Sequence, residues 1–166
     1  MSLYTLYGTE LSYYTGKVRA YLDWKGIAYE EVLPSSEVFK SILLPNIGRG
    51  IIPVVKTPSG EFIQDSTEII HTIEQQHPER PMMPAGPVQQ FASLLLDLFA
   101  DEWLNIPALH YRWAYNADWA YLQFGKTSIP EATEQEQFEL GRKNAQFFFR
   151  WPVMLGVTED TVSEVE

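Results

Sequence analysis

A proline-dense segment, His77–Pro87, divides the sequence into two parts with different hydrophobic patterns. The segment reads HPERPMMPAGP and has no periodic apolar residues, which is typical of a linker between domains. Before it, short β-favouring runs alternate with helical ones, whereas only helical spacing follows it. A chain of 166 residues is long enough for two small domains. We therefore predict a first domain at 1–78, a linker at 79–87 and a second domain at 88–166.

The first part predicts an α/β domain with the element order βαβαββα. Strands are expected at 3–7 and 28–32, and a hairpin is expected at 51–64, where β-branched runs flank a Pro-Ser-Gly turn. Helices are expected after the first strand, at 38–44, and from Asp65 onward, where Asp-Ser-Thr-Glu has the pattern of a capping box.

The second part predicts an all-helical domain. Its first helix is expected to kink or end at Pro107, and another is expected to end before Pro152. Thr158 is expected to cap a third helix. Because the sequence stops at Glu166 after about two helical turns without a glycine or proline stop signal, we expect this domain to be incomplete. The apolar residues that carry the longer patterns are Val88, Phe91, Leu95, Leu98, Phe138, Ala145 and Phe149.

The charge of the chain excludes several classes of partner. It has 22 acidic and 12 basic residues, a formal net charge of −10, which disfavours binding to nucleic acid or to an anionic membrane. No apolar run approaches the ~20 residues of a transmembrane helix, and the N-terminus does not have the pattern of a signal peptide. We therefore expect a soluble, cytoplasmic protein.

The absence of cysteine removes several chemistries. Disulfides, a CxxC redox pair, thiolate zinc sites and a cysteine nucleophile are all excluded. A thiol–disulfide oxidoreductase is accordingly disfavoured, since no cysteine can form the mixed disulfide. The three histidines have no spacing that suggests a metal site, and we predict no metal.

Three segments of the first part, taken together, have the character of one known family. They read LSYYTGKVRAYLDWKGIAYEE, IIPVV and IQDSTEIIHTIEQQHP. They resemble, in this order, the first strand–helix region, the cis-proline strand and the acid–serine glutathione signature of glutathione S-transferases. The resemblance covers most of residues 1–78. It implies a thioredoxin-like domain with a mixed four-stranded sheet, followed by a helical domain, and it implies glutathione as co-substrate and a homodimer.

Ser12 lies where serine-type members of this superfamily, such as bacterial ones, carry the hydroxyl that hydrogen-bonds the glutathione sulfur. A hydroxyl donor at the positive end of a helix favours thiolate over thiol, so the resemblance implies that Ser12 activates the nucleophile. The alternative is a serine that only caps a helix. Tyr13 and Tyr14 are neighbouring hydroxyls, and Tyr4 and Tyr7 resemble the tyrosine of other classes.

The resemblance also implies a glutathione-binding set. Ile52–Pro53 would be a cis peptide bond, after which Val54 would pair with the cysteinyl part of the tripeptide as an added strand. Asp65 and Ser66 would hold the ammonium and carboxylate of the γ-glutamyl end. The alternatives are an ordinary trans edge proline and a plain capping box that needs no ligand.

The loop before Pro53 departs from the family pattern. Most members carry Asn-Pro-x-Gly-Lys-Val-Pro, whereas this chain has NIGRGIIP, one residue longer and without the first proline. Contacts to the glycyl carboxylate are therefore open, with Arg49 or Lys40 as candidate cations.

In the second part, the aromatic-rich run LHYRWAYNADWAYLQF would line a cleft for a small apolar electrophile. The acceptor-pocket candidates are Tyr14 from the first domain and His110 and Trp113, with Tyr111 and Arg112 beside them. Helix–helix packing is the alternative for most of these aromatic residues. The sequence thus leaves two functions: a glutathione transferase, or a related module that binds without catalysis.

Overall fold

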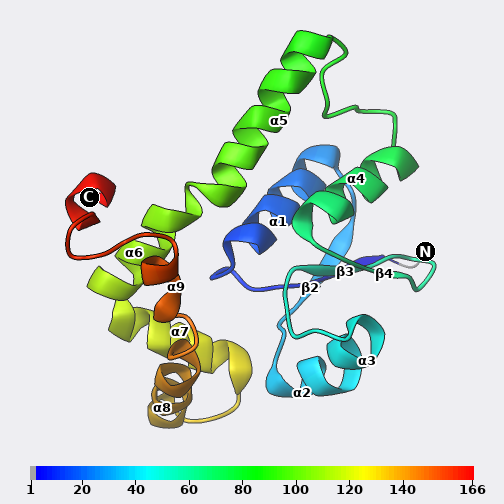
Figure 1. Cartoon of the computed structure of the whole chain (residues 1–166). Helices are drawn as coiled ribbons and strands as arrows, with labels where there is room; N and C mark the ends of the chain where they lie inside the picture. The colour runs from blue at the N-terminus through cyan, green and yellow to red at the C-terminus, as the bar shows by residue number, and fades with distance from the viewer. Residues whose placement is uncertain (1–2) are drawn as a thin grey trace. The chain divides into compact units, whose positions relative to one another are not determined.

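The computed structural model describes residues 3–166, so that residues 1 and 2 of the predicted first domain lie outside the described range. The chain divides into two compact units, the first ending at Met82 and the second running from Met83 to Glu166. Each unit is described by itself (Figure 1). Over residues 3–166, no helix combines the length and the apolar character needed to cross a membrane.

The first unit is a mixed four-stranded sheet with helices on both faces, the predicted thioredoxin-like arrangement. The strand order is β2-β1-β3-β4, in which β1 and β2 are parallel and the other pairs are antiparallel. The elements follow the predicted order and are β1 (Tyr4–Tyr7), α1 (Tyr13–Lys25), β2 (Tyr29–Val32), α2 (Ser36–Val38), a π-helical turn η1 (Phe39–Leu43), α3 (Leu44–Ile47), β3 (Val54–Lys56), β4 (Phe62–Gln64) and α4 (Ser66–Gln76).

Alternation along the strands sends successive side chains to opposite faces of the sheet. On one face, Leu6 and Val55 pack against α1 and α4, which lie side by side in Figure 1. On the other face, Tyr7 and Val54 pack against Leu43 of the α2–α3 segment. The predicted end of α1 at Gly26 is confirmed: this glycine has φ 73° and closes the helix with a backbone hydrogen bond to Leu22.

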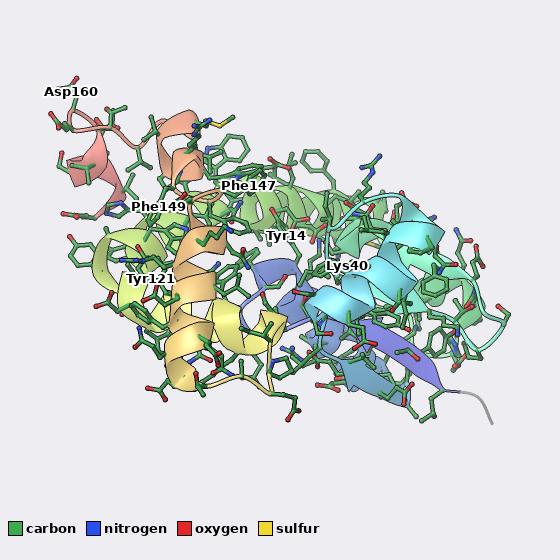
Figure 2. The ribbon with its side chains drawn as sticks, turned by 90° about the horizontal axis from the view of Figure 1, so that it is seen from below. Tyr14, Lys40, Tyr121, Phe147, Phe149 and Asp160 are labelled. Atoms are coloured by element: carbon green, nitrogen blue, oxygen red, sulfur yellow. The ribbon has the colours of Figure 1, made fainter. Side chains whose placement is uncertain are left out.

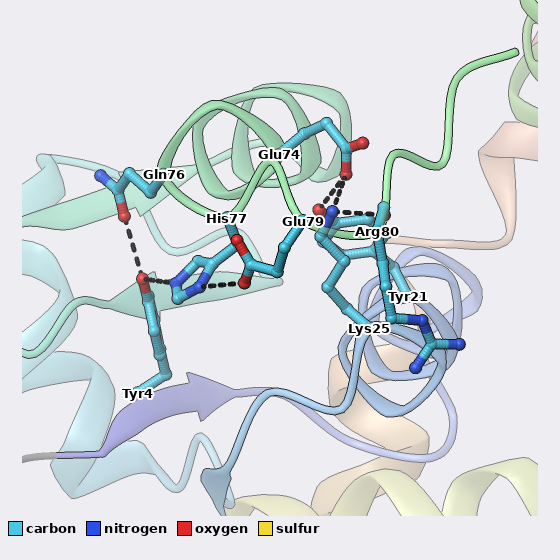
Figure 3. A network of polar contacts seen from close by, with 8 residues as sticks. All are labelled: Tyr4, Tyr21, Lys25, Glu74, Gln76, His77, Glu79 and Arg80. Carbon is cyan, nitrogen blue, oxygen red and sulfur yellow. Dashed lines mark hydrogen bonds and ion pairs between the residues drawn. The ribbon is translucent and has the colours of Figure 1, made fainter.

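A polar network ties the end of α4 to α1 (Figure 3). The Lys25 side chain is 1% exposed, and its ammonium lies 2.9 Å from the Glu74 carboxylate and donates to the Arg80 carbonyl at 2.6 Å. Glu74 also accepts from the Tyr21 hydroxyl at 2.7 Å and from the Met82 N–H at 2.6 Å. The segment that follows α4 is therefore fixed to the C-terminal half of α1 by charge-assisted hydrogen bonds.

The second unit is helical, as predicted, but its helices begin and end at other residues. The helix that was expected to reach Pro107 ends at Glu102, and Pro107 lies in the first turn of the next helix. The helix that was expected to end just before Pro152 ends at Ala145, and Pro152 lies in the first turn of a short helix. The elements are α5 (Pro87–Glu102), α6 (Asn105–Tyr115), α7 (Ala117–Ser128), α8 (Glu134–Ala145), α9 (Arg150–Met154) and α10 (Val162–Val165).

Both differences have one physical reason. The first backbone N–H groups of a helix have no intrahelical acceptor, so a proline in the first turn loses no hydrogen bond. Thr158 was also wrongly predicted as a cap, because Thr161 is the residue that precedes α10. Thr158 instead begins the turn before α10, where its N–H donates to the Thr161 hydroxyl at 2.9 Å.

Helices α7 and α8 pack at very short range. A methyl group on Gly125 would lie 1.7 Å from the Gln137 carbonyl oxygen, and one on Gly141 would lie 1.7 Å from that of Tyr121. Tyr121 of α7 lies 6.1 Å from Phe149 between ring centroids (Figure 2). Glycine at these two positions is what lets the backbones approach.

Candidate functional site

The strand register brings three predicted site segments to one end of the sheet. Val54, the first residue of β3, pairs with Tyr7 at the end of β1 and with Gln64 at the end of β4. Tyr7 leads to Ser12, and Gln64 leads directly to Asp65. The loop before α1, the Ile52–Pro53 bond and the start of α4 therefore meet at this end, which we call the Val54 end of the sheet.

Ser12 is the N-cap of α1. Its hydroxyl oxygen accepts a hydrogen bond from the Thr15 N–H at 3.2 Å, and its backbone is extended, with φ −83° and ψ 117°. Ser12 thus has the capping role that the sequence left as an alternative. Capping uses only a lone pair of the hydroxyl oxygen, so the hydroxyl can still donate its proton to a ligand. The positive end of the helix dipole lies beside it, where it favours an anion.

The neighbouring hydroxyls differ in their surroundings. The Tyr4 hydroxyl donates to Gln76 at 2.9 Å and lies 3.0 Å from His77, so it is engaged at the far end of α4 (Figure 3). Tyr7 is buried and stacks on Phe62. Tyr14, at the start of α1, is half-buried (Figure 2).

The Ile52–Pro53 peptide bond is cis. Val54 is fully buried and has strand partners on both sides, so its backbone N–H and C=O face β1 or β4. Ile52 precedes the strand and is half-buried. Ile52 is therefore better placed than Val54 for backbone pairing with an extended peptide.

Asp65 and Ser66 form the start of α4. The Asp65 Oδ1 accepts from the N–H groups of Thr67 and Glu68, at 2.9 and 3.3 Å, which leaves Oδ2 for another partner. Asp65 has φ 83° and ψ 128°, a conformation that costs about 1–3 kcal/mol for a residue with a side chain and that clusters at functional sites. Ser66 is 5% exposed.

A hydrogen bond connects the two helix starts: the Lys17 ammonium, in the second turn of α1, donates to the Thr67 hydroxyl at 3.4 Å. This contact links the first turn of α4 to the start of α1. Such helix starts favour anionic groups of a ligand.

The candidate cations for a glycyl carboxylate lie elsewhere in the first unit. Lys40 is exposed on η1 (Figure 2), and Arg49 is exposed between α3 and β3. No contact in the structure assigns either of them to the site. Over residues 3–166, no group of three or more histidine, aspartate or glutamate side chains is placed to hold a metal ion.

The acceptor-pocket candidates of the second unit have different surroundings. Trp113 is buried in the hydrophobic core, where its ring stacks on Phe148 at 6.1 Å and lies 5.7 Å from Phe124. These contacts agree with the alternative for Trp113, in which the ring serves helix–helix packing and does not line an acceptor pocket. His110 is 8% exposed, and its Nε2 lies 3.2 Å from the Glu166 carboxylate.

Two features have little signal in the sequence. The Glu166 contact joins residues more than fifty positions apart, and nothing near either residue indicates it. The buried Lys25–Glu74 pair has only a weak signal, a lysine in the last turn of a helix directly before its glycine cap.

Comparisons with known proteins identify this arrangement. Residues 6–81 match the family model for the glutathione S-transferase N-terminal domain. No curated protein sequence matches the chain. Among solved structures, a glutathione S-transferase from Methylobacterium radiotolerans in complex with glutathione sulfonate is 24% identical with a TM-score of 0.57, over 83% of this chain and 63% of that one.

Two further structures agree in fold. A glutathione transferase family member from Pseudomonas fluorescens with bound glutathione is 20% identical with a TM-score of 0.53, over 96% of this chain and 74% of that one. The β-etherase of a Sphingobium strain is 21% identical with a TM-score of 0.59, over 99% and 74%. The chain thus spans less than two thirds of the Methylobacterium protein. Its residues 6–81 belong to the family of glutathione S-transferase N-terminal domains, and the fold of the chain is that of these structures.

Proposed function

We propose that this protein binds glutathione at the Val54 end of the sheet and transfers its thiolate to a small apolar electrophile. The observation that carries the proposal is the register of Val54 with Tyr7 and Gln64, because it joins the three predicted glutathione-binding segments. The glutathione sulfonate and glutathione in the Methylobacterium and Pseudomonas structures support the same ligand.

Each part of the tripeptide has a proposed partner. The backbone of Ile52 pairs with the cysteinyl residue, next to Pro53 and Val54. Ser66, at the start of α4, binds the γ-glutamyl carboxylate, and the free Oδ2 of Asp65 binds the ammonium. The Ser12 hydroxyl donates to the sulfur.

The proposed chemical step is a nucleophilic displacement. The thiol proton leaves to solvent, and the Ser12 hydroxyl and the dipole of α1 stabilise the thiolate that remains. The sulfur lone pair then forms a bond to an electrophilic carbon of the acceptor, and the leaving group departs with the electron pair of the broken bond. Tyr14 and His110 remain the acceptor-side candidates, whereas Trp113 belongs to the core of the second unit. We propose a cytoplasmic location.

Separate variants test binding and activation. We expect Ser66→Ala to weaken glutathione binding about tenfold, the loss of a hydrogen bond to a charged group. Ser12→Ala is expected to keep glutathione binding but to lower conjugation of an activated aryl chloride about a hundredfold, as when a single donor to a developing anion is removed. Calorimetry and the conjugation rate measure the two effects.

Ser41→Ala is the matched control, because Ser41 is exposed and its hydroxyl donates only to the Glu37 carbonyl of its own helical segment. Glutathione binding without conjugation in the unmodified protein would favour the non-catalytic module, which the altered loop at 46–53 also favours. A folded protein that does not bind glutathione would overturn both functions.

A further inference from the structure

Gly8 and Thr15 pack against each other where β1 leads into α1. Gly8 is buried directly after the strand, and Thr15 is fully buried in the first turn of the helix. A methyl group on Gly8 would lie 2.2 Å from Cγ2 and 2.8 Å from Oγ1 of Thr15. The φ angle of Gly8 is not positive, so glycine is needed here for space and not for its backbone conformation.

Neither partner of this contact can move aside easily. The Thr15 side chain is β-branched and therefore stiff at χ1, and none of it is exposed. The backbone of Gly8 is held by its N–H, which donates to the Val32 carbonyl at 3.2 Å and continues the pairing of β1 with β2. The contact therefore fixes the first turn of α1 against the end of β1.

The turn formed by residues 8–12 connects these two points. At its end, the Ser12 N–H donates to the Thr9 carbonyl at 3.0 Å, and the Ser12 hydroxyl accepts from the Thr15 N–H at 3.2 Å. Thr15 thus acts on both ends of the turn, through its side chain on Gly8 and through its N–H on Ser12. Because the N–H occupies one lone pair of the Ser12 hydroxyl, it limits the directions in which that hydroxyl can donate.

The hydroxyl of Thr15 takes no part in these contacts. Over residues 3–166, its oxygen is buried without a hydrogen-bond partner. A buried polar atom without a partner lowers stability, so the hydroxyl is not what makes threonine suitable at this position. The shape of the side chain is what fills the space beside Gly8, and valine has the same shape without the hydroxyl.

From these contacts we propose that Thr15 is the positioning residue of the Ser12 hydroxyl. Its side chain, packed on Gly8, holds the turn so that Ser12 can donate to the glutathione sulfur. The inference rests on the proposed function, and it adds the residue that orients the activating group. Thr15 is fully buried and acts through Ser12, whose displacement by a fraction of an ångström would lower the rate of the chemical step.

The ionisation of bound glutathione gives a readout that a merely structural role would not change. Thr15→Ala removes the contact with Gly8, and we expect it to lower the conjugation rate about tenfold. The pH profile of the rate should also move to higher pH, because the thiolate is less stabilised, while calorimetry shows unchanged glutathione affinity. Thr15→Val keeps the shape and should retain both the rate and the profile.

Further variants perturb the same contact by other means. Thr15→Ser removes only Cγ2, the atom nearest to Gly8, and should give an intermediate loss of rate, which keeps the test decisive if Thr15→Ala does not fold. Gly8→Ala displaces Thr15 from the other side and should act like Thr15→Ala. Gly16→Ala is the matched control, because the space beside this glycine is open, and it should leave the rate and the profile unchanged.

The variants distinguish failure of this inference from failure of the proposed function. If Ser12→Ala changes the rate and the pH profile but Thr15→Ala and Thr15→Ser do not, the positioning role is wrong and the proposed function stands. A Thr15→Val protein as impaired as Thr15→Ala would also overturn the inference, since the hydroxyl and not the shape would then be required. If Ser12→Ala itself changes neither, the proposed activation fails, and the role of Thr15 fails with it.

Discussion

Glu74 and Lys25 show how unequal burial decides what a single substitution does. The Lys25 side chain is 1% exposed, whereas the Glu74 side chain is 21% exposed and has two further donors, Tyr21 and Met82. Glu74→Gln would leave a buried charge without its counterion, and we expect a loss of about 3 kcal/mol in the free energy of unfolding. Lys25→Met, which fills the same space with apolar atoms, should cost about 1 kcal/mol. Urea unfolding followed by circular dichroism measures both, and an equal loss would contradict this account.

The same residues predict how stability depends on pH. Burial acts to raise the pKa of Glu74, but hydrogen bonds from Tyr21, Lys25 and the Met82 N–H outweigh it and lower that pKa below 4.5. Burial and the bond to Glu74 raise the pKa of Tyr21 above 10.0. Glu74 therefore contributes stability that is present above about pH 4.5 and is lost as the pH falls through its folded-state pKa. The Tyr21 contribution is present below about pH 10 and is lost as the pH rises further.

Substitution separates the two sides of this profile. Glu74→Gln should flatten the acid side of the curve of unfolding free energy against pH, and Tyr21→Phe should flatten the alkaline side. Glu61→Gln, at an exposed position in the hairpin turn, serves as the control and should leave both sides unchanged. An acid side that is unaltered by Glu74→Gln would show that other carboxylates dominate it.

At the scale of elements, the close contact between α7 and α8 predicts that a glycine-to-alanine substitution destabilises the protein, the opposite of what helix propensity alone predicts. Alanine is about 1 kcal/mol better than glycine inside a helix. A methyl group on Gly141 would, however, lie 1.7 Å from the Tyr121 carbonyl oxygen, a backbone atom that cannot move cheaply. We expect Gly141→Ala to lower the free energy of unfolding by about 3 kcal/mol. Gly16→Ala in α1, where no atom beyond the neighbouring residues and the backbone of the helix itself lies within 4 Å of the added methyl, should instead raise it. Thermal melting of the two variants provides the comparison.

Elements were predictable from sequence where the local pattern decides them. The strand–helix alternation of the first unit and the end of α1 at Gly26 follow from periodicity and glycine geometry. Pro107 and Pro152 misled the prediction, because a proline fits the first turn of a helix as readily as it ends one, and only tertiary packing decides between the two.

In the candidate site, too, some features follow from the local sequence and others depend on long-range folding. Asp65 was predicted from the local pattern of a helix cap, and Ser12 from the family resemblance; both cap helices in the structure. The preference for Ile52 over Val54 depends on strand register, and the contact of Glu166 with His110 depends on long-range folding. Neither can be deduced from the residues beside it.

For the whole molecule, α5 carries the strongest indication of a second copy. Val88, Phe91 and Leu96 are each more than 65% exposed, and no residue of this helix is buried. A helix that is apolar on most sides is normally covered by protein, and the family resemblance leads us to expect a homodimer. Calibrated sizing should therefore give about twice the chain mass of 19.1 kDa.

Introduction of a charge on α5 tests whether this helix forms the interface. Leu96→Glu would bury a carboxylate at a dimer contact, an energetic cost that should convert the protein to a monomer. Leu33→Glu makes the same chemical change at a 47% exposed position of the first unit and should leave the dimer intact. If the unmodified protein elutes as a monomer at every concentration, or if both variants remain dimeric, α5 is not the interface and its apolar surface requires another partner.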